Sequence, residues 1–105
     1  MLVVRRYAHN DSIFLGDDYL IKGVAGAIFW SLIRAWCDEG RESFSNRELR
    51  ADPSLGLPEL ADNLETRLHL LDRRLRERDC GILMERTGRG RFKLVVARRV
   101  RLSDC

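Results

Sequence analysis

The sequence predicts an α+β fold in one domain, and three observations support this expectation. Apolar runs rich in β-branched and aromatic residues occupy the beginning of the chain. Over the middle of the chain, the apolar residues change to helical spacing. The end of the chain returns to short β-rich runs around a glycine-containing turn. A length of 105 residues fits a single domain, residues 1–105.

Residues 1–22 are predicted to form an antiparallel β-meander. The runs 2–7 (LVVRRY) and 12–15 (SIFL) have strand composition, and a third run resumes at 19–21. Gly16, Asp17 and Asp18 separate the last two runs with tight-turn chemistry. We expect Tyr7 and Phe14 to pack this sheet against the first helix.

A three-helix unit is predicted over residues 23–78. The first helix follows Gly23 and ends at Gly40, and its apolar residues repeat at i, i+3, i+4 and i+7. A short strand is expected at 42–44. The sequence Ser45-x-x-Glu48 is a capping box that opens a second helix over 46–51. The expected core aromatics are Phe29, Trp30, Trp36 and Phe44.

The third helix is predicted over residues 59–78, after a loop that holds both prolines of the chain. One apolar stripe runs along it. A β-hairpin follows, with strands 82–86 and 91–96 around the turn 87–90, and a last strand includes Val100 and Leu102. The leucines of the stripe are Leu60, Leu64, Leu68, Leu71 and Leu75.

This order of elements predicts a winged helix-turn-helix, with residues 82–102 as the wing and C-terminal strand. The chain resembles the DNA-binding effector domains of OmpR/PhoB-type response regulators, most specifically over 64–94. The leucine stripe is similar to that family's recognition helix, and Gly88-x-Gly90 followed by an aromatic is similar to its wing. The resemblance implies sequence-specific DNA binding in bacterial gene regulation, with the third helix in the major groove and the wing on the minor groove or backbone.

The chain differs from that family's pattern in two places. Arg91 stands between the second glycine and Phe92. Leu70 and Asp72 flank Leu71, where the family usually has basic residues. These residues motivate a second hypothesis, a winged helix whose third helix contacts a protein partner, including a sensor domain. The absence of a receiver domain predicts either a stand-alone domain or a piece of a larger sensor.

Charge is distributed unevenly along the chain. Residues 1–63 carry 7 basic and 10 acidic side chains, whereas residues 64–101 carry 12 basic and 5 acidic ones. This asymmetry predicts a polyanionic partner for the C-terminal half, and double-stranded DNA is the first candidate. RNA is a third reading of the same basic surface, although the sequence offers no RNP-type aromatic pattern.

The candidate DNA-binding residues lie on the third helix and the wing. With the leucine stripe facing inward, one helix flank is basic, the opposite flank holds His69 and Asp72, and Thr66 and Arg73 lie between them. Arginines at the glycine-rich wing tip suit phosphate or a narrow minor groove. The predicted site is Asn63, Thr66, Arg67, His69, Arg73, Arg74, Arg86, Arg89 and Arg91.

Other classes of function have no motif in the sequence. His9 and His69 are isolated, and Cys37, Cys80 and Cys105 form no CxxC pair, so neither a metal site nor a disulfide framework is expected. No catalytic set is recognisable, and we expect no enzyme activity and no cofactor. Neither a signal peptide nor a membrane span is expected, which favours a cytoplasmic protein. The edges of the N-terminal sheet leave a homodimer open.

Overall fold

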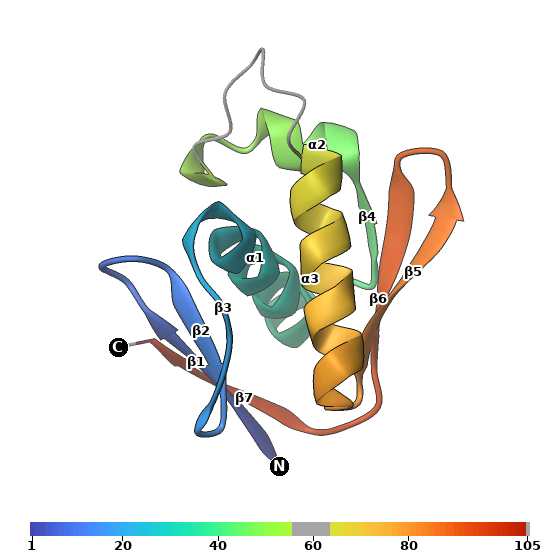
Figure 1. Ribbon diagram of the computed structural model, residues 1–105. Helices are drawn as coiled ribbons and strands as arrows, with labels where there is room; N and C mark the ends of the chain where they lie inside the picture. Colours follow the sequence, from blue (N-terminus) through green and yellow to red (C-terminus); the bar gives the residue numbers. More distant parts are fainter. Residues whose placement is uncertain (56–63, 105) are drawn as a thin grey trace.

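The computed structural model describes residues 1–55 and 64–104, and its architecture is α+β, as the sequence predicts. In this part of the chain, two sheets and three α-helices pack around one core (Figure 1). The elements are β1 (Leu2–Tyr7), β2 (Ser12–Leu15), β3 (Asp18–Ile21), α1 (Gly23–Glu39), β4 (Ser43–Ser45), α2 (Asn46–Ala51), the 3₁₀ turn η1 (Pro53–Leu55), α3 (Leu64–Arg78), β5 (Ile82–Gly88), β6 (Arg91–Val96) and β7 (Val100–Asp104).

The N-terminal meander forms as predicted, and it gains a fourth strand from the other end of the chain. The strand order is β3-β2-β1-β7, with β1 antiparallel to β2 and parallel to β7. The Arg6 guanidinium binds both carboxylate oxygens of Asp104, at 3.1 and 2.9 Å. The first and last strands therefore lie side by side, which no local signal in the sequence indicates.

The two faces of this sheet have different roles. Val4 and Ile13 are fully buried on the face that packs against α1. Phe14 pairs with Arg5 on β1 and with Tyr19 on β3, so these side chains share the opposite face. The expectation that Tyr7 and Phe14 pack against the first helix is therefore wrong. Both faces carry apolar residues, so alternation alone does not identify the inner one.

Helix α1 crosses the centre of the molecule, between the four-stranded sheet and the rest of the fold (Figure 1). Its interior side chains include Ile28, Phe29 and Leu32, which are fully buried. The predicted end at Gly40 is confirmed, because Gly40 adopts the left-handed conformation with φ 67°. Of the aromatics expected in the core, Trp36 is only half-buried.

The second sheet has the order β4-β6-β5 and contains the predicted hairpin. Strand β4, which joins α1 to α2, pairs with β6 so that Phe44 stacks on Phe92 with ring centroids 5.9 Å apart. The Ser45 hydroxyl accepts from the Glu48 backbone N–H at 3.2 Å and caps α2, as predicted. Strand β6 has the predicted bounds, whereas β5 runs two residues longer than predicted, so that only Arg89 and Gly90 separate the two strands.

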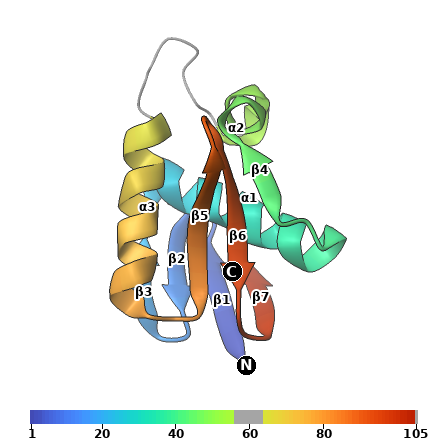
Figure 2. The same cartoon turned by 90° about the vertical axis from the view of Figure 1, so that its right-hand side faces the viewer.

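Helix α3 lies beside the hairpin and buries the predicted leucine stripe. Leu64, Leu68, Leu71 and Leu75 are all 7% exposed or less. The expected start of this helix at residue 59, and Leu60 of the stripe, lie outside the described residues. Viewed from the hairpin side, α3 stands next to β5, and α2 lies near the hairpin tip (Figure 2). No helix in 1–55 or 64–104 has the length and apolar character to cross a membrane.

Candidate nucleic-acid interface

Helix α3 and the β5–β6 hairpin form one face of the molecule, and α2 meets them at the end where the hairpin turns (Figures 1 and 2). The predicted site residues that the structure describes all belong to α3 or to this hairpin. Because α3 packs its leucine stripe inward, its two flanks and outer crest define what this face presents.

Four residues join α2, α3 and the hairpin. The Asn46 backbone N–H donates to the Gly90 carbonyl at the hairpin tip at 2.8 Å. The Asn46 side-chain amide donates to Glu65, in the first turn of α3. The other Glu65 oxygen accepts from Arg86 of β5 at 3.2 Å. We call Asn46, Glu65, Arg86 and Gly90 the junction, since together they fix the hairpin tip against both helices.

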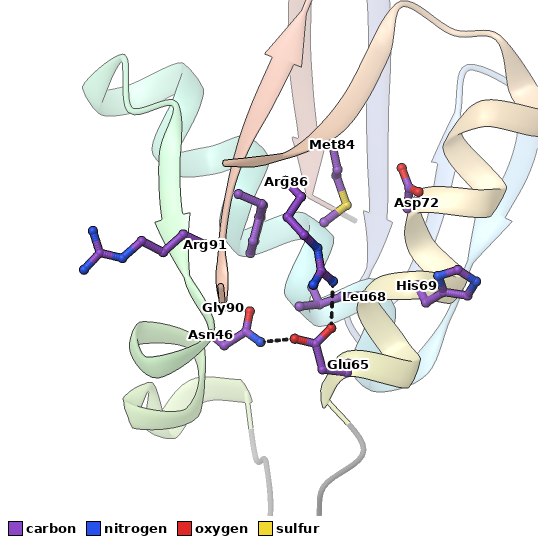
Figure 3. Close-up of a pocket in the computed structure, with 10 residues that line it drawn as sticks. Asn46, Glu65, Leu68, His69, Asp72, Met84, Arg86, Gly90 and Arg91 are labelled. Carbon is purple, nitrogen blue, oxygen red and sulfur yellow. Dashed lines mark hydrogen bonds and ion pairs between the residues drawn. The ribbon is translucent and has the colours of Figure 1, made fainter. Parts of the chain in front are cut away.

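The α3 flank that faces the hairpin borders a hollow of about 90 Å³ (Figure 3). In Figure 3, Arg86 reaches across it to Glu65, while Arg91 points away on the other side of the hairpin. The acidic groups Glu65 and Asp72 lie on this flank. The lining residues are Asn46, Glu65, Leu68, His69, Asp72, Met84, Arg86, Gly90, Arg91 and Phe92.

The basic flank of α3 faces the other way, towards β3. The Arg78 guanidinium donates to the Tyr19 carbonyl of β3 at 2.7 Å, which fixes this orientation. Arg67 and Arg74 are half-buried on the same flank. One Arg67 guanidinium nitrogen is buried without an acceptor in the described part of the chain. The basic flank and the hairpin arginines are thus on opposite sides of α3.

Along the outer crest of α3, most charges are already neutralised. Arg73 pairs with Glu77 at 3.3 Å, and Arg76 pairs with Asp72 at 3.1 Å. Both pairs have i,i+4 spacing, which is ordinary for a solvated helix. Thr66 and His69 are exposed on this crest. The crest therefore offers hydrogen-bonding groups with little excess charge.

The hairpin tip is where positive charge remains available. Arg89 and Arg91 are exposed, and within 1–55 and 64–104 neither guanidinium has an ion-pair or hydrogen-bond partner. Gly90 between them has φ 66°, the left-handed conformation that the sharp turn needs. Below the tip, Lys93 pairs with Glu85 at 3.5 Å. The two tip arginines are thus free to meet an anionic partner.

The structure gathers part of the predicted site and divides the rest. Arg86, Arg89 and Arg91 lie on the hairpin, beside the crest that holds Thr66, His69 and Arg73. Arg67 and Arg74 lie on the far flank, and Asn63 lies outside the described residues. Sequence reasoning missed Asn46 and Glu65, which hold the hairpin in place. A buried asparagine directly after a helix cap has no local signature, because its partners are distant in the chain.

Comparisons of the chain with protein-family models, with curated proteins and with solved structures give no match.

Proposed function

We propose that this protein is the DNA-binding domain of a bacterial transcriptional regulator, with a winged-helix mode of binding. In this mode, α3 enters the major groove, and the β5–β6 hairpin is the wing that contacts the phosphate backbone or the minor groove. The major groove of B-DNA admits an α-helix, and the exposed crest of α3 would face the base edges.

The observation that carries the proposal is the pair of unpartnered arginines at the hairpin tip. An acidic neighbour neutralises each of Arg73, Arg76 and Arg86. Arg89 and Arg91, by contrast, are exposed and have no acidic neighbour in the described part of the chain. The Asn46–Gly90 hydrogen bond holds this tip against α2, and the contacts of Asn46 and Arg86 with Glu65 join it to the first turn of α3. The backbone of the tip is thus held in place, while the exposed Arg91 side chain points to the side of the hairpin away from α3. Exposed guanidinium groups at such a tip suit phosphates of the DNA backbone.

The crest of α3 supports base contacts more than backbone contacts. Thr66 and His69 are exposed, and hydroxyl and imidazole groups hydrogen-bond to base edges. The Arg73–Glu77 pair is exposed, so Arg73 can exchange its carboxylate partner for guanine at small cost. The wing would then supply the electrostatic attraction, and the helix would supply the sequence preference.

The first prediction is that reversing both tip charges abolishes most DNA affinity. Fluorescence anisotropy with random duplex DNA at several salt concentrations compares the wild type with Arg89→Glu/Arg91→Glu. Each phosphate contact releases counterions, so losing two contacts should reduce the slope of log affinity against log salt by about 2. Affinity at low salt should fall by at least about tenfold.

A matched control separates the hairpin tip from net charge. Arg98 and Arg99 are exposed in the connection between β6 and β7, at the other end of the hairpin from the tip. The variant Arg98→Glu/Arg99→Glu changes the net charge by the same amount and should retain the wild-type salt slope. Equal losses in both variants, or no binding by the wild type at low salt, would refute the proposed mode.

One observation favours a second candidate, a winged helix that binds a protein. Leu70 is 39% exposed on α3, and of the large hydrophobic side chains the structure describes, only Met1 is also exposed. An acidic flank and an exposed leucine on the same helix suit a protein surface better than phosphate.

The second prediction addresses this candidate through Leu70→Asp. Because Leu70 is exposed, the substitution should leave thermal unfolding unchanged. If Leu70→Asp loses DNA affinity, and the wild type forms no complex with a protein, the DNA mode is supported. Capture of a partner from a lysate by the wild type, lost in Leu70→Asp while DNA affinity persists, would support the protein mode.

A further inference from the structure

The outer face of the four-stranded sheet carries three aromatic rings that no described helix covers. Phe14 contacts both Tyr7 and Tyr19 edge to face, with ring centroids 5.5 and 5.7 Å apart. The helices lie on the other side of the sheet (Figure 1). An aromatic cluster on an open sheet face is a feature of contact surfaces.

This outer face divides into an aromatic half and a basic half. Phe14 and Tyr19 occupy β2 and β3, while Arg5 lies opposite Phe14 on β1. Arg101 of β7 lies opposite Val3, and it is exposed without a partner in the described part of the chain. The basic residues therefore lie on β1 and β7, and two of the three rings lie on β2 and β3, while Tyr7 is at the far end of β1.

The acidic turn between β2 and β3 lies at the same end of the sheet as Arg101. The Gly16 backbone N–H donates to the Val3 carbonyl at 2.7 Å, which places the turn beside Val3. Asp17 is 98% exposed in its side chain, and its contact with Arg5 is long, at 3.8 Å. Asp17 and Asp18 are thus at one edge of this end, and Arg101 is at the other.

We propose that this face binds the same face of a second copy of the chain, related by a two-fold axis parallel to the strands. Such an axis places β3 of one copy over β7 of the other and keeps the same ends together. Phe14 then meets the other copy's Arg5 in a cation–π contact, and Asp17 in the β2–β3 turn meets the other copy's Arg101. Each complementary contact occurs twice.

The same features argue against a single-stranded nucleic acid on this face. The rings engage one another edge to face, which leaves less flat ring surface for bases to stack on. Asp17 and Asp18 would also repel a phosphate backbone that follows the strands. The charge pattern fits a partner that carries both signs in the reverse order, as a second copy does.

The dimer is expected to be weak. Four short strands about 4.8 Å apart cover roughly 300 Å², well below the approximately 800 Å² that each partner buries in a standard interface. Sedimentation equilibrium should therefore extend from about 10 µM to about 1 mM. The dimer is independent of DNA, so its failure would leave the proposed function untouched.

Charge exchange between two variants provides the test. Arg101→Glu places like charges opposite each other in its own dimer, and so does Asp17→Arg. Each variant alone should dimerise at least about tenfold more weakly than the wild type. An equimolar mixture of the two should recover dimers, because Glu then faces Arg at one contact and the native pair is present at the other.

Circular dichroism should show unchanged unfolding for both variants, since Asp17 and Arg101 are both exposed. A wild type that stays monomeric to about 1 mM would overturn the proposal. So would a mixture that associates no better than its components. Salt-dependent binding of a dT oligonucleotide, lost in Arg101→Glu, would assign the face to single-stranded nucleic acid instead.

Discussion

At the scale of single residues, the closest constraint in the fold is at Gly26. A Cβ atom built on Gly26 would lie 2.0 Å from the Asp11 backbone oxygen. The loop before β2 is held against α1 at this point, because the Gly23 N–H donates to the Asn10 carbonyl at 3.0 Å. A side chain at position 26 would therefore contact the backbone of Asp11, and a backbone cannot move aside as a flexible side chain could.

The third prediction follows at this scale. Gly26→Ala would gain about 1 kcal/mol of helix propensity, but the clash with backbone costs more. We expect a net loss of about 1 to 3 kcal/mol in the free energy of unfolding, measured by urea denaturation. Ala35→Gly on the same helix serves as a control and should cost about 1 kcal/mol. A more stable Gly26→Ala variant would show that the loop moves away freely.

At the scale of elements, Glu65 determines how the hairpin meets α3. It accepts from Asn46 and Arg86 at once, so it neutralises one hairpin arginine while it fixes the tip. The side chains of Glu65 and Arg86 are both exposed enough for solvent to screen the ion pair between them. The junction thus positions the hairpin and lowers its positive charge.

The fourth prediction separates these two effects with Glu65→Gln, and it assumes the proposed DNA function. Glutamine keeps a carbonyl acceptor for Asn46 but releases Arg86. We expect tighter binding to random duplex DNA, with a salt slope steeper by about 1, measured by anisotropy. The control Glu39→Gln removes the same charge from the exposed end of α1 and should leave the slope unchanged. An unchanged slope in Glu65→Gln would mean that Arg86 makes no phosphate contact.

Elements with local signals were predictable from the sequence. The Ser45 cap, the leucine stripe of α3 and the glycines of the hairpin turn each act through neighbours in the chain, and the structure confirms the elements they predict. The resulting α+β class is also confirmed. The roles of the site residues in binding DNA stay predictions.

Features that depend on distant partners were not predictable. Helical periodicity divides α3 into two flanks, but only packing decides that the flank with Glu65 faces the hairpin and the flank with Arg78 faces β3. In the same way, Tyr7 and Phe14 were assigned to the wrong face of the sheet. The sequence of β7 indicates a strand but contains nothing that selects β1 as its parallel neighbour.

At the scale of the whole molecule, the ion pair between Arg6 and Asp104 links residues 98 positions apart. The hydrogen bond from Arg6, supported by its charge, lowers the pKa of the Asp104 carboxyl below its ordinary value. Folding therefore favours the ionised form. The resulting stability is present above the ordinary aspartate pKa of about 3.9 and is lost as the pH falls through the lowered native value.

The fifth prediction is a difference that depends on pH. Asp104→Asn should unfold at a lower temperature than the wild type at pH 7, and the two melting temperatures should converge at about pH 2. Asp18→Asn is the control, because Asp18 is exposed and has no ion-pair partner in the described part of the chain. A gap between Asp104→Asn and the wild type that persists unchanged at about pH 2 would mean that the carboxylate charge does not stabilise the β1–β7 pair.

The parallel pairing of β1 with β7 also has a consequence for how the chain folds during synthesis. Residues of α1, α2 and the hairpin leave the ribosome before β7 does, and their mostly local contacts can form in that order. The β1 edge must wait for the last strand, with its backbone N–H and C=O groups unpaired and open to other chains. Joining strands so far apart in sequence also carries a large loop-closure entropy. Completion of this sheet is therefore expected to be the late step of folding, and a nascent chain halted before β7 would expose an aggregation-prone strand.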